Sequence, residues 1–386
     1  MEKNLQRRNF LNKLVYSAGS LFLIPFTPIK KLFSNEDESN TTNYSMGKEV
    51  ILKTSALGFQ WETKDPFLFC VHHEDAFPKG NGNMGPDVEH LKGRHIGDDF
   101  IIKDGFRMYH GKTIPGFPGH PHRGFETITV VRKGIVDHAD SMGAAGRYGN
   151  GDVQWMTAGK GVQHSEMFPL VHTDKENYME LFQIWLNLPK KNKMVDPHFK
   201  MLWKENIPNI IETDRNGKKT TIEVIAGKFG TVDAQIPPPN SWASNEENEV
   251  VVWNLQLEEG AEIKIPASKG KINRTLYFYE GKSLEINSNL ISSYHSIDVI
   301  SDVDLLLKAN NSECRILILQ GKPINEPVIQ YGPFVMNTKQ EIQQAFEDYH
   351  NTQFGGWPWD KFDKVHSSDS GRFAKHADGT IEIKNS

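Results

Sequence analysis

Two histidines one residue apart are the first feature of the sequence that could do chemistry. His120 and His122 lie in PGFPGHPHRGFETITVVRKG, between a turn rich in glycine and proline and an apolar run typical of a β-strand. Side chains two residues apart on a strand point to the same side of the sheet. The spacing therefore predicts that both imidazoles point into the interior of a β-barrel and converge there.

A second alternating pair strengthens this interpretation. His164 and Glu166 follow a glycine turn in TAGKGVQHSEMFP and again share one side of a predicted strand. Four buried polar side chains would need four sets of partners, whereas one cation satisfies them together. Three imidazoles and one carboxylate, without sulfur, suit iron(II), manganese, copper or nickel, with coordination positions left open for small ligands. Zinc is more readily filled by four ligands, so iron(II) is our first choice.

Other polar and aromatic residues are expected around this centre. His110 in RMYHG, and Gln154 and Trp155 in DVQWMTAG, are candidates for lining a pocket, although Trp155 could equally belong to the core, as we expect for Met156. The remaining histidines that we considered have no convergent partners, which favours surface positions over a second metal site. They are His72, His73, His295 and His366.

β-strands must position these residues, and the length and composition of the chain are compatible with a protein rich in strands. The chain has 386 residues, 38% of them hydrophobic, and many glycines and prolines, which predicts two turn-rich globular domains. The formal net charge of −5 is spread along the chain, which argues against a nucleic-acid partner. Only Cys70 and Cys314 are present, far apart, so the main signature of a zinc ribbon, an iron–sulfur cluster or a disulfide scaffold is missing. Two buried thiols are expected, with a single disulfide as the alternative.

Short apolar runs with turn punctuation continue from residue 51 almost to the C-terminus. They predict an all-β protein with two tandem antiparallel β-sandwich or jelly-roll barrels. We expect an N-terminal domain at 51–188 with the metal site, a charged linker at 188–197, and a metal-free C-terminal domain at 198–335, because the stretch 274–281 is aromatic and apolar instead of histidine-rich. A helix over 339–351 and an irregular tail complete a C-terminal segment at 336–386.

The N-terminus is expected to be a targeting signal. The sequence RRNFLNKLVYSAGSLFLIPF places two arginines before an apolar run too short for a comfortable membrane span, as in twin-arginine export signals. We therefore predict a signal segment at 1–34, a flexible linker at 35–50, and export to the periplasm by the twin-arginine translocation machinery. No small-x-small cleavage site follows, so an uncleaved anchor is the alternative, and a cytoplasmic location is expected if the signal does not function.

Several long motifs in the same order resemble those of the pirins, a branch of the cupin superfamily. They are GFPGHPHRGFETIT, GDVQWMTAGKGVQHSEM, QIWLNLP, EPVIQYGPFVMNT and GRFAKHADG, and the resemblance runs from about Trp61 to the C-terminus. It implies a bicupin with one iron in the N-terminal barrel, bound by His120, His122, His164 and Glu166. The general cupin pattern also offers Glu126, which is not a ligand in pirins. For Glu126 we expect a supporting part, such as orienting an imidazole or pairing with Arg123.

The resemblance also implies an activity. Several pirins have quercetin 2,3-dioxygenase activity, so a flavonol would bind the iron and dioxygen would open its heterocyclic ring, with Glu166 or a nearby base taking the substrate proton. Two alternatives stay open. One is a metal-binding regulatory protein without turnover, like the eukaryotic pirins, against which the export signal argues. The other is a cupin enzyme with a different small-molecule substrate. Two barrels in one chain can bury a shared interface, so a monomer is sufficient.

Overall fold

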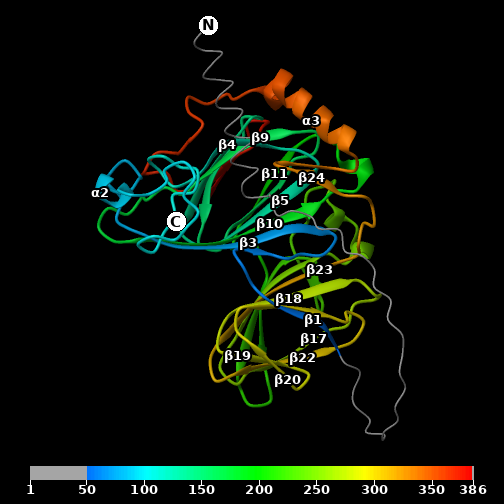
Figure 1. The fold of residues 1–386 in the computed structure, drawn as a ribbon. Helices are drawn as coiled ribbons and strands as arrows, with labels where there is room; N and C mark the ends of the chain where they lie inside the picture. Colours follow the sequence, from blue (N-terminus) through cyan, green and yellow to red (C-terminus); the bar gives the residue numbers. More distant parts are fainter. Residues whose placement is uncertain (1–49, 385–386) are drawn as a thin grey trace, which may run out of the picture.

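The computed structural model describes residues 50–384, and its fold is all-β, as predicted (Figure 1). The expected signal segment at 1–34 and nearly all of the expected linker at 35–50 lie outside the described residues. Two barrels, each built from two antiparallel sheets, lie one against the other in Figure 1. Among residues 50–384, no helix is long and apolar enough to cross a membrane.

The N-terminal barrel consists of two six-stranded sheets. We call the sheet nearer the other barrel the inner sheet; its order is β11 (His198–Leu202), β8 (Val153–Thr157), β5 (Phe125–Lys133), β10 (Asn177–Asn187), β3 (Phe67–Phe77) and β2 (Gln60–Trp61). The outer sheet has the order β27 (Ile381–Lys384), β26 (Arg372–Lys375), β7 (Ala145–Gly149), β6 (Ile135–Asp140), β9 (Val162–Met167) and β4 (Gly116–His122).

The C-terminal barrel pairs a seven-stranded sheet with a four-stranded one. The larger sheet has the order β1 (Ile51–Ala56), β21 (His295–Val299), β18 (Asn273–Glu280), β23 (Cys314–Gly321), β16 (Val251–Leu257), β13 (Lys219–Ala226) and β12 (Asn209–Thr213). The smaller sheet has the order β17 (Glu262–Ile265), β22 (Leu305–Asn310), β19 (Ser283–Ile286) and β20 (Asn289–Ser292). The interior of this barrel is a continuous core of aliphatic and aromatic side chains, and the group of possible metal ligands found among the described residues lies in the other barrel.

Short elements connect and flank the barrels. The two small hairpins are β14 (Lys228–Phe229) with β15 (Val232–Asp233), and β24 (Ile329–Tyr331) with β25 (Phe334–Met336). The helices are α2 (Val88–Leu91), α3 (Lys339–Thr352) and the 3-10 turns Lys190–Asn192, Trp242–Ser244, Glu246–Asn248 and Gln353–Gly355. The predicted helix over 339–351 is thus confirmed as α3. Thr338 caps it, because its hydroxyl accepts from the Glu341 backbone while the Glu341 carboxylate accepts from the Thr338 backbone.

The two barrels share one hydrophobic core. The inner sheet of the N-terminal barrel packs on the seven-stranded sheet, as β5 residues Ile128 and Val130 join a buried cluster with Tyr277 and Tyr279 of β18. Trp61 lies in this cluster and stacks on Tyr277, with ring centroids 5.0 Å apart. One face of the inner sheet is consequently apolar and packs against the C-terminal barrel, while the opposite face points into the N-terminal barrel.

The sheet pairing differs in three places from the order that we predicted along the chain. Strand β1 pairs with β21 of the C-terminal barrel, although we placed residues from 51 onward in the N-terminal domain. Strand β11 pairs with β8 of the inner sheet, although we placed residue 198 in the C-terminal domain. The tail also contains a hairpin, β26 with β27, which extends the outer sheet beside β7, where we expected irregular structure. In each case, long-range hydrogen bonding outweighs chain order.

Both cysteines are buried free thiols, Cys70 in the shared core and Cys314 inside the C-terminal barrel. This confirms the expectation of two thiols over the alternative of a disulfide.

Candidate metal centre

Three imidazoles converge inside the N-terminal barrel. His120 and His122 lie on β4 and His164 on β9, and the antiparallel register places His120 directly opposite His164. The ring centroids are 4.5–4.9 Å apart in all three pairs, and one ring nitrogen of each residue lies within 4.8 Å of those of the other two. The predicted convergence of the first histidine pair with His164 is therefore present in the structure.

A bulge and a glycine bring β4 this close to β9. The register shifts between Phe117 and His120, and this shift places both histidines of β4 on the interior side. Gly116 at the start of β4 has φ +127°, and a β-carbon there would lie 2.5 Å from the backbone oxygen of Glu166. A side chain at this position would separate the two strands. The glycine-rich sequence before the histidines thus allows the close approach that the centre requires.

The electrostatics of the three imidazoles suit metal binding. Burial lowers the pKa of His122 and His164 well below the usual value, and that of His120 to about 4, so all three rings are neutral near pH 7. His120 Nδ1 donates to the Pro118 carbonyl oxygen at 3.0 Å, which leaves Nε2 as its ligand atom. Neither ring nitrogen of His164 has a hydrogen-bond partner in the described part of the chain. Neutral imidazoles held in this way in a barrel interior fit a transition-metal ion.

Glu166 lies beside the imidazoles but is held by other side chains. Its Oε2 atom is 3.9 Å from His164 Nε2. Oε1 accepts a hydrogen bond from Thr129 Oγ1 at 2.8 Å, and Oε2 accepts from Gln183 Nε2 at 3.2 Å. Burial raises the pKa of Glu166, and the hydrogen bonds from Thr129 and Gln183 act in the opposite direction. Its position next to the three imidazoles agrees with the ligand set that we expected, and its role as a metal ligand stays a prediction.

Glu126 lies on the other face of β5, away from the imidazoles. It is fully buried where the barrels meet, and its oxygens accept from Thr157 Oγ1 at 2.6 Å and Ser241 Oγ at 2.5 Å. Burial raises its pKa to about 7. The supporting roles that we expected are not seen, since Glu126 contacts no ligand imidazole through a hydrogen bond, and Arg123 pairs instead with Asp348 of α3 at 2.7 Å. The general cupin carboxylate is thus used here to join the barrels.

The two pocket candidates on β8 point in opposite directions. Gln154 is opposite Thr129 in the register of β5 and β8, so it shares the interior side with Thr129. It is buried, and neither its amide nitrogen nor its amide oxygen has a partner among residues 50–384. Trp155 belongs to the shared core between the barrels. The prediction that Trp155 lines the pocket is therefore wrong, and its core alternative is correct.

His110 lies at the partly exposed side of the centre. Its Nδ1 donates to the Gly97 carbonyl oxygen at 2.9 Å, which fixes the ring. The ring centroid is 4.9 Å from that of Phe100 and 5.9 Å from that of Phe117, and Phe117 is in turn 6.3 Å from His120. All four side chains are half-buried. They form a wall of aromatic rings, which we call the aromatic wall, leading to the imidazole of His120.

Sequence reasoning missed a fourth imidazole in the barrel interior. His138 on β6 is opposite Glu166 in the register of β6 and β9, and its ring centroid is 5.5 Å from that of His164. Its Nε2 lies 3.2 Å from Asp140 Oδ2. The signal was available, because His138 and Asp140 alternate in IVDHAD as His164 and Glu166 do. A glycine, Gly134 with φ +85°, also precedes this strand, so the pair shows the same pattern as His164 and Glu166 and was overlooked.

His72 and His73 are not surface residues, which corrects their expected position. They alternate across β3, so they point to opposite faces of the inner sheet. His73 Nδ1 lies 2.8 Å from the Tyr109 hydroxyl, and His72 Nε2 lies 3.4 Å from Glu180. Both side chains are thus used in separate polar contacts, and neither joins the three imidazoles.

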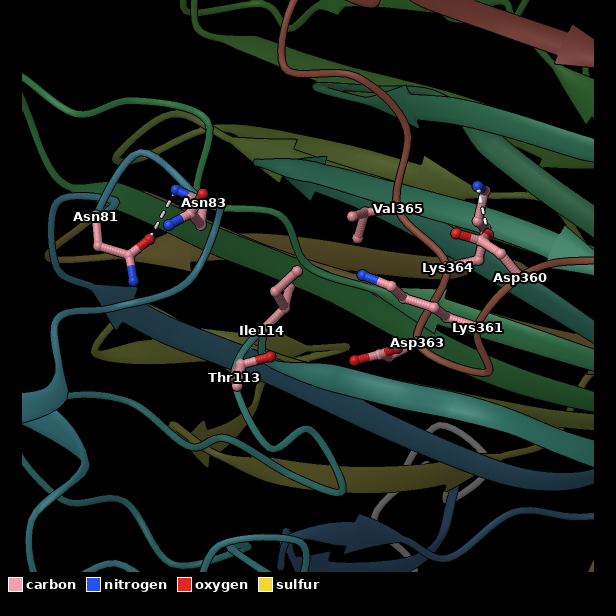
Figure 2. A pocket seen from close by; sticks show the side chains of 9 residues that line it. All are labelled: Asn81, Asn83, Thr113, Ile114, Asp360, Lys361, Asp363, Lys364 and Val365. Atoms are coloured by element: carbon pink, nitrogen blue, oxygen red, sulfur yellow. Dashed lines mark hydrogen bonds and ion pairs between the residues drawn. The ribbon is translucent and has the colours of Figure 1, made fainter.

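A separate surface hollow of about 440 Å³ lies where three segments meet (Figure 2). It is lined by Asn81 and Asn83, by Thr113 and Ile114, and by the tail segment 360–365. The polar groups in it pair with each other, as Asn83 N donates to Asn81 Oδ1 and Lys364 Nζ donates to Asp360 Oδ1, both at 2.8 Å. None of the candidate metal ligands lines this hollow.

Comparisons with known proteins agree with the geometry. The sequence profile of the family Pirin matches residues 83–186, and the profile of the Pirin C-terminal cupin domain matches residues 252–355. A Pseudomonas aeruginosa protein named "putative quercetin 2,3-dioxygenase" is 36% identical over 240 residues, which are 62% of this chain and 79% of that protein. A Solanum lycopersicum protein named "Pirin-like protein" is 36% identical over 268 residues, covering 68% of this chain and 82% of the relative.

A solved structure shares the fold. The crystal structure of a quercetin 2,3-dioxygenase from Acinetobacter baumannii superposes with a TM-score of 0.62 at 25% sequence identity. The match covers 80% of this chain and 98% of that protein. The fold of this chain is thus shared with a protein named quercetin 2,3-dioxygenase.

Proposed function

The chain belongs to the pirin family of bicupins, and from this premise we propose that it is an iron(II)-dependent dioxygenase that opens the heterocyclic ring of quercetin-like flavonols. The observation that carries the proposal is the cluster of three neutral imidazoles beside Glu166, inside the barrel and at the end of the aromatic wall. Its relatives named as quercetin 2,3-dioxygenases support the choice of substrate class.

The residues of the chain divide into those that hold the metal and those that receive the substrate. His120, His122 and His164 would hold the ion, with Glu166 as the expected fourth ligand. When bound, the metal supplies a Lewis acid with open positions for the substrate oxygens and dioxygen. The interior of the barrel limits the access of water to this point, because His122, His164 and Glu166 are buried between the two sheets.

The aromatic wall suits a planar aromatic substrate. Phe117 lies between His110 and His120 in ring contact with both, and it is half-buried, as both histidines are. A flavonol ring stacking there would place its oxygens toward His120 Nε2, since His120 Nδ1 is occupied by Pro118.

Glu166 is the group best placed to take the proton of a substrate hydroxyl. Burial raises the pKa of its carboxyl group, so a proton taken at Oε2 is retained more readily than on an exposed carboxylate. No other carboxylate lies within 4.0 Å of a ligand imidazole among residues 50–384.

Metal content followed by oxygen consumption tests the proposal. Untagged protein purified without chelators should contain about one iron per chain and should consume oxygen with quercetin, releasing carbon monoxide. A Glu166→Gln variant should keep its fold and lose most of this turnover. Iron without oxygen uptake would favour a non-catalytic metal-binding protein or another substrate, and absence of any metal would contradict the proposed centre.

We also propose that the N-terminal segment directs export by the twin-arginine pathway, which carries folded proteins and would let metal insertion precede transport. The motif RRNFL supports it. Fractionation of cells that produce the native chain should place the protein in the periplasm, and an Arg7→Lys, Arg8→Lys variant should remain in the cytoplasm. Equal distribution of both forms would contradict the signal.

A further inference from the structure

The carboxylate of Glu166 is held by a hydrogen-bonded cluster that crosses the barrel interior. Glu166 lies on β9 of the outer sheet, whereas Thr129 on β5 and Gln183 on β10 belong to the inner sheet. Thr129 and Gln183 are opposite each other in the register of β5 and β10. The two sheets are therefore joined, next to the imidazoles, through one carboxylate and two neutral side chains.

The contacts use both oxygens of the carboxylate differently. Thr129 Oγ1 lies 2.8 Å from Glu166 Oε1, and Gln183 Nε2 lies 3.2 Å from Oε2. Thr129 Oγ1 also lies 2.6 Å from Gln183 Oε1, so its single hydroxyl proton is shared between this amide oxygen and Glu166 Oε1, and the three side chains form one cluster. The oxygen near the imidazoles is Oε2, 3.9 Å from His164 Nε2. The contacts from Thr129 and Gln183 thus fix the rotation of the carboxylate and determine which oxygen faces the centre.

We propose that Thr129, which holds Oε1, and Gln183, which holds Oε2, are positioning residues that fix the rotation of the Glu166 carboxylate so that Oε2 faces the metal. This inference rests on the metal centre of the proposed function. A carboxylate without these contacts can rotate, so it binds a metal with either oxygen, with both, or with neither. With these contacts, it presents one oxygen, and the remaining coordination positions stay open for the substrate and dioxygen.

The chain offers a matched control for Thr129. Thr127 lies two residues earlier on β5 and points to the same interior side, so it is buried in the same strand and the same barrel. Its hydroxyl has no hydrogen-bond partner in the described part of the chain. Thr127→Val and Thr129→Val make the same chemical change two residues apart, and only the second removes a contact to Glu166.

Cobalt(II) binding to the full chain tests the proposal, because the visible absorption of this ion reports the number and kind of its ligands. Thr129→Val and Gln183→Leu should each weaken cobalt(II) binding by about 10- to 100-fold and shift the visible bands, as is usual when a partner of a metal ligand is lost. Thr127→Val should match the wild type in affinity and spectrum. Thr129→Ser, which keeps the hydroxyl, should restore both.

The outcomes separate this proposal from the one on which it rests. If the wild type does not bind cobalt(II), the metal centre itself is refuted. If the wild type binds it and Thr129→Val and Gln183→Leu keep the wild-type affinity and bands, the centre stands and the positioning role is wrong. Thermal unfolding of each metal-free variant identifies a folding defect; should Thr129→Val not fold, the half-buried Gln183 decides the question through Gln183→Leu.

Discussion

Packing three neutral imidazoles together inside the barrel lowers the stability of the metal-free protein. His164 is fully buried, and desolvation together with the neighbouring His120 and His122 keeps its pKa well below the usual value. A core residue of the same size without polar atoms would pack there without this cost. A cation that takes one lone pair from each ring removes the penalty, so the energetics of the apo cluster themselves indicate metal binding.

The first prediction at this scale is that His164→Ala abolishes metal binding. The variant removes the imidazole that contacts both of the others and that has no hydrogen-bond partner among the described residues. Metal analysis of purified protein should find less than about a tenth of the wild-type content, as expected when one of so few ligands is lost. His295→Ala, in the other barrel, is the control and should keep the metal. A His164→Ala protein with a full complement of iron would rule out the centre.

The second prediction concerns pH and Glu126. Its folded pKa of about 7 lies above the ordinary value of 4.5, so the folded state binds the proton more tightly and stability falls as pH rises between these values. The free energy of unfolding of the wild type should fall by about 3 kcal/mol over this pH window because of this group. Glu126→Gln has the shape of the protonated carboxyl group and does not ionise, so it does not lose this stability. Urea unfolding at pH 5 and pH 8 should therefore show the free energy of unfolding of the variant rising relative to that of the wild type. The same pH dependence of the free energy of unfolding in both proteins would show that folding does not raise the pKa of Glu126.

At the scale of strands, the sequence indicated which residues alternate but not always which face they take. The interior position of His120, His122 and His164 was predictable, since histidines that alternate on a strand beside glycine turns can share one cation. Strands β5 and β8 are buried along both faces, so alternation does not distinguish the metal side from the side that meets the other barrel. That is why Glu126 and Trp155 were assigned near the metal and lie in the contact between the barrels.

The C-terminal tail was the least predictable element. Its hairpin pairs with β7, which lies far earlier in the chain, and each strand has only four residues, so nothing local indicates the partner. The part of the tail that precedes this hairpin contacts β6 and β4 of the outer sheet, and α3 contacts β9. Trp359 Nε1 donates to the Asp140 carbonyl oxygen at 2.8 Å, and Gly119 N donates to the Phe362 carbonyl oxygen at 2.7 Å. Both contacts fall on strands that carry side chains of the barrel interior.

A prediction about this support uses Gln163, which is next to His164 and points outward. Its Oε1 accepts from the Tyr349 hydroxyl of α3 at 3.0 Å, and its Nε2 donates to the Gln353 carbonyl oxygen at 2.5 Å. Gln163→Ala leaves both partners without their contact, so urea unfolding should show a loss of about 2 kcal/mol. Gln344→Ala on the exposed side of α3 should cost less than about 0.5 kcal/mol. Equal stabilities would mean that α3 does not support β9.

At the scale of the whole molecule, the two barrels are interlocked rather than sequential. Strand β1 comes first in the described chain and completes the C-terminal barrel (Figure 1). Strands β26 and β27 come last and extend the N-terminal barrel. Cutting the chain between the barrels would therefore remove strands from each. Together with the shared core, this arrangement predicts that neither barrel is a separate unfolding unit.

The last prediction uses Trp61 and the metal to test whether the two barrels unfold together. Trp61 is fully buried and stacks on Tyr277 of the other barrel, so Trp61→Ala should cost about 3–5 kcal/mol, as for large aromatic residues in a core. Calorimetry should show one transition in both proteins. A ligand raises the unfolding temperature of whatever unit binds it, so cobalt(II) should move the whole transition upward. Two transitions, of which cobalt(II) moves only one, would instead show that the barrels unfold independently and that the shared core contributes little to their coupling.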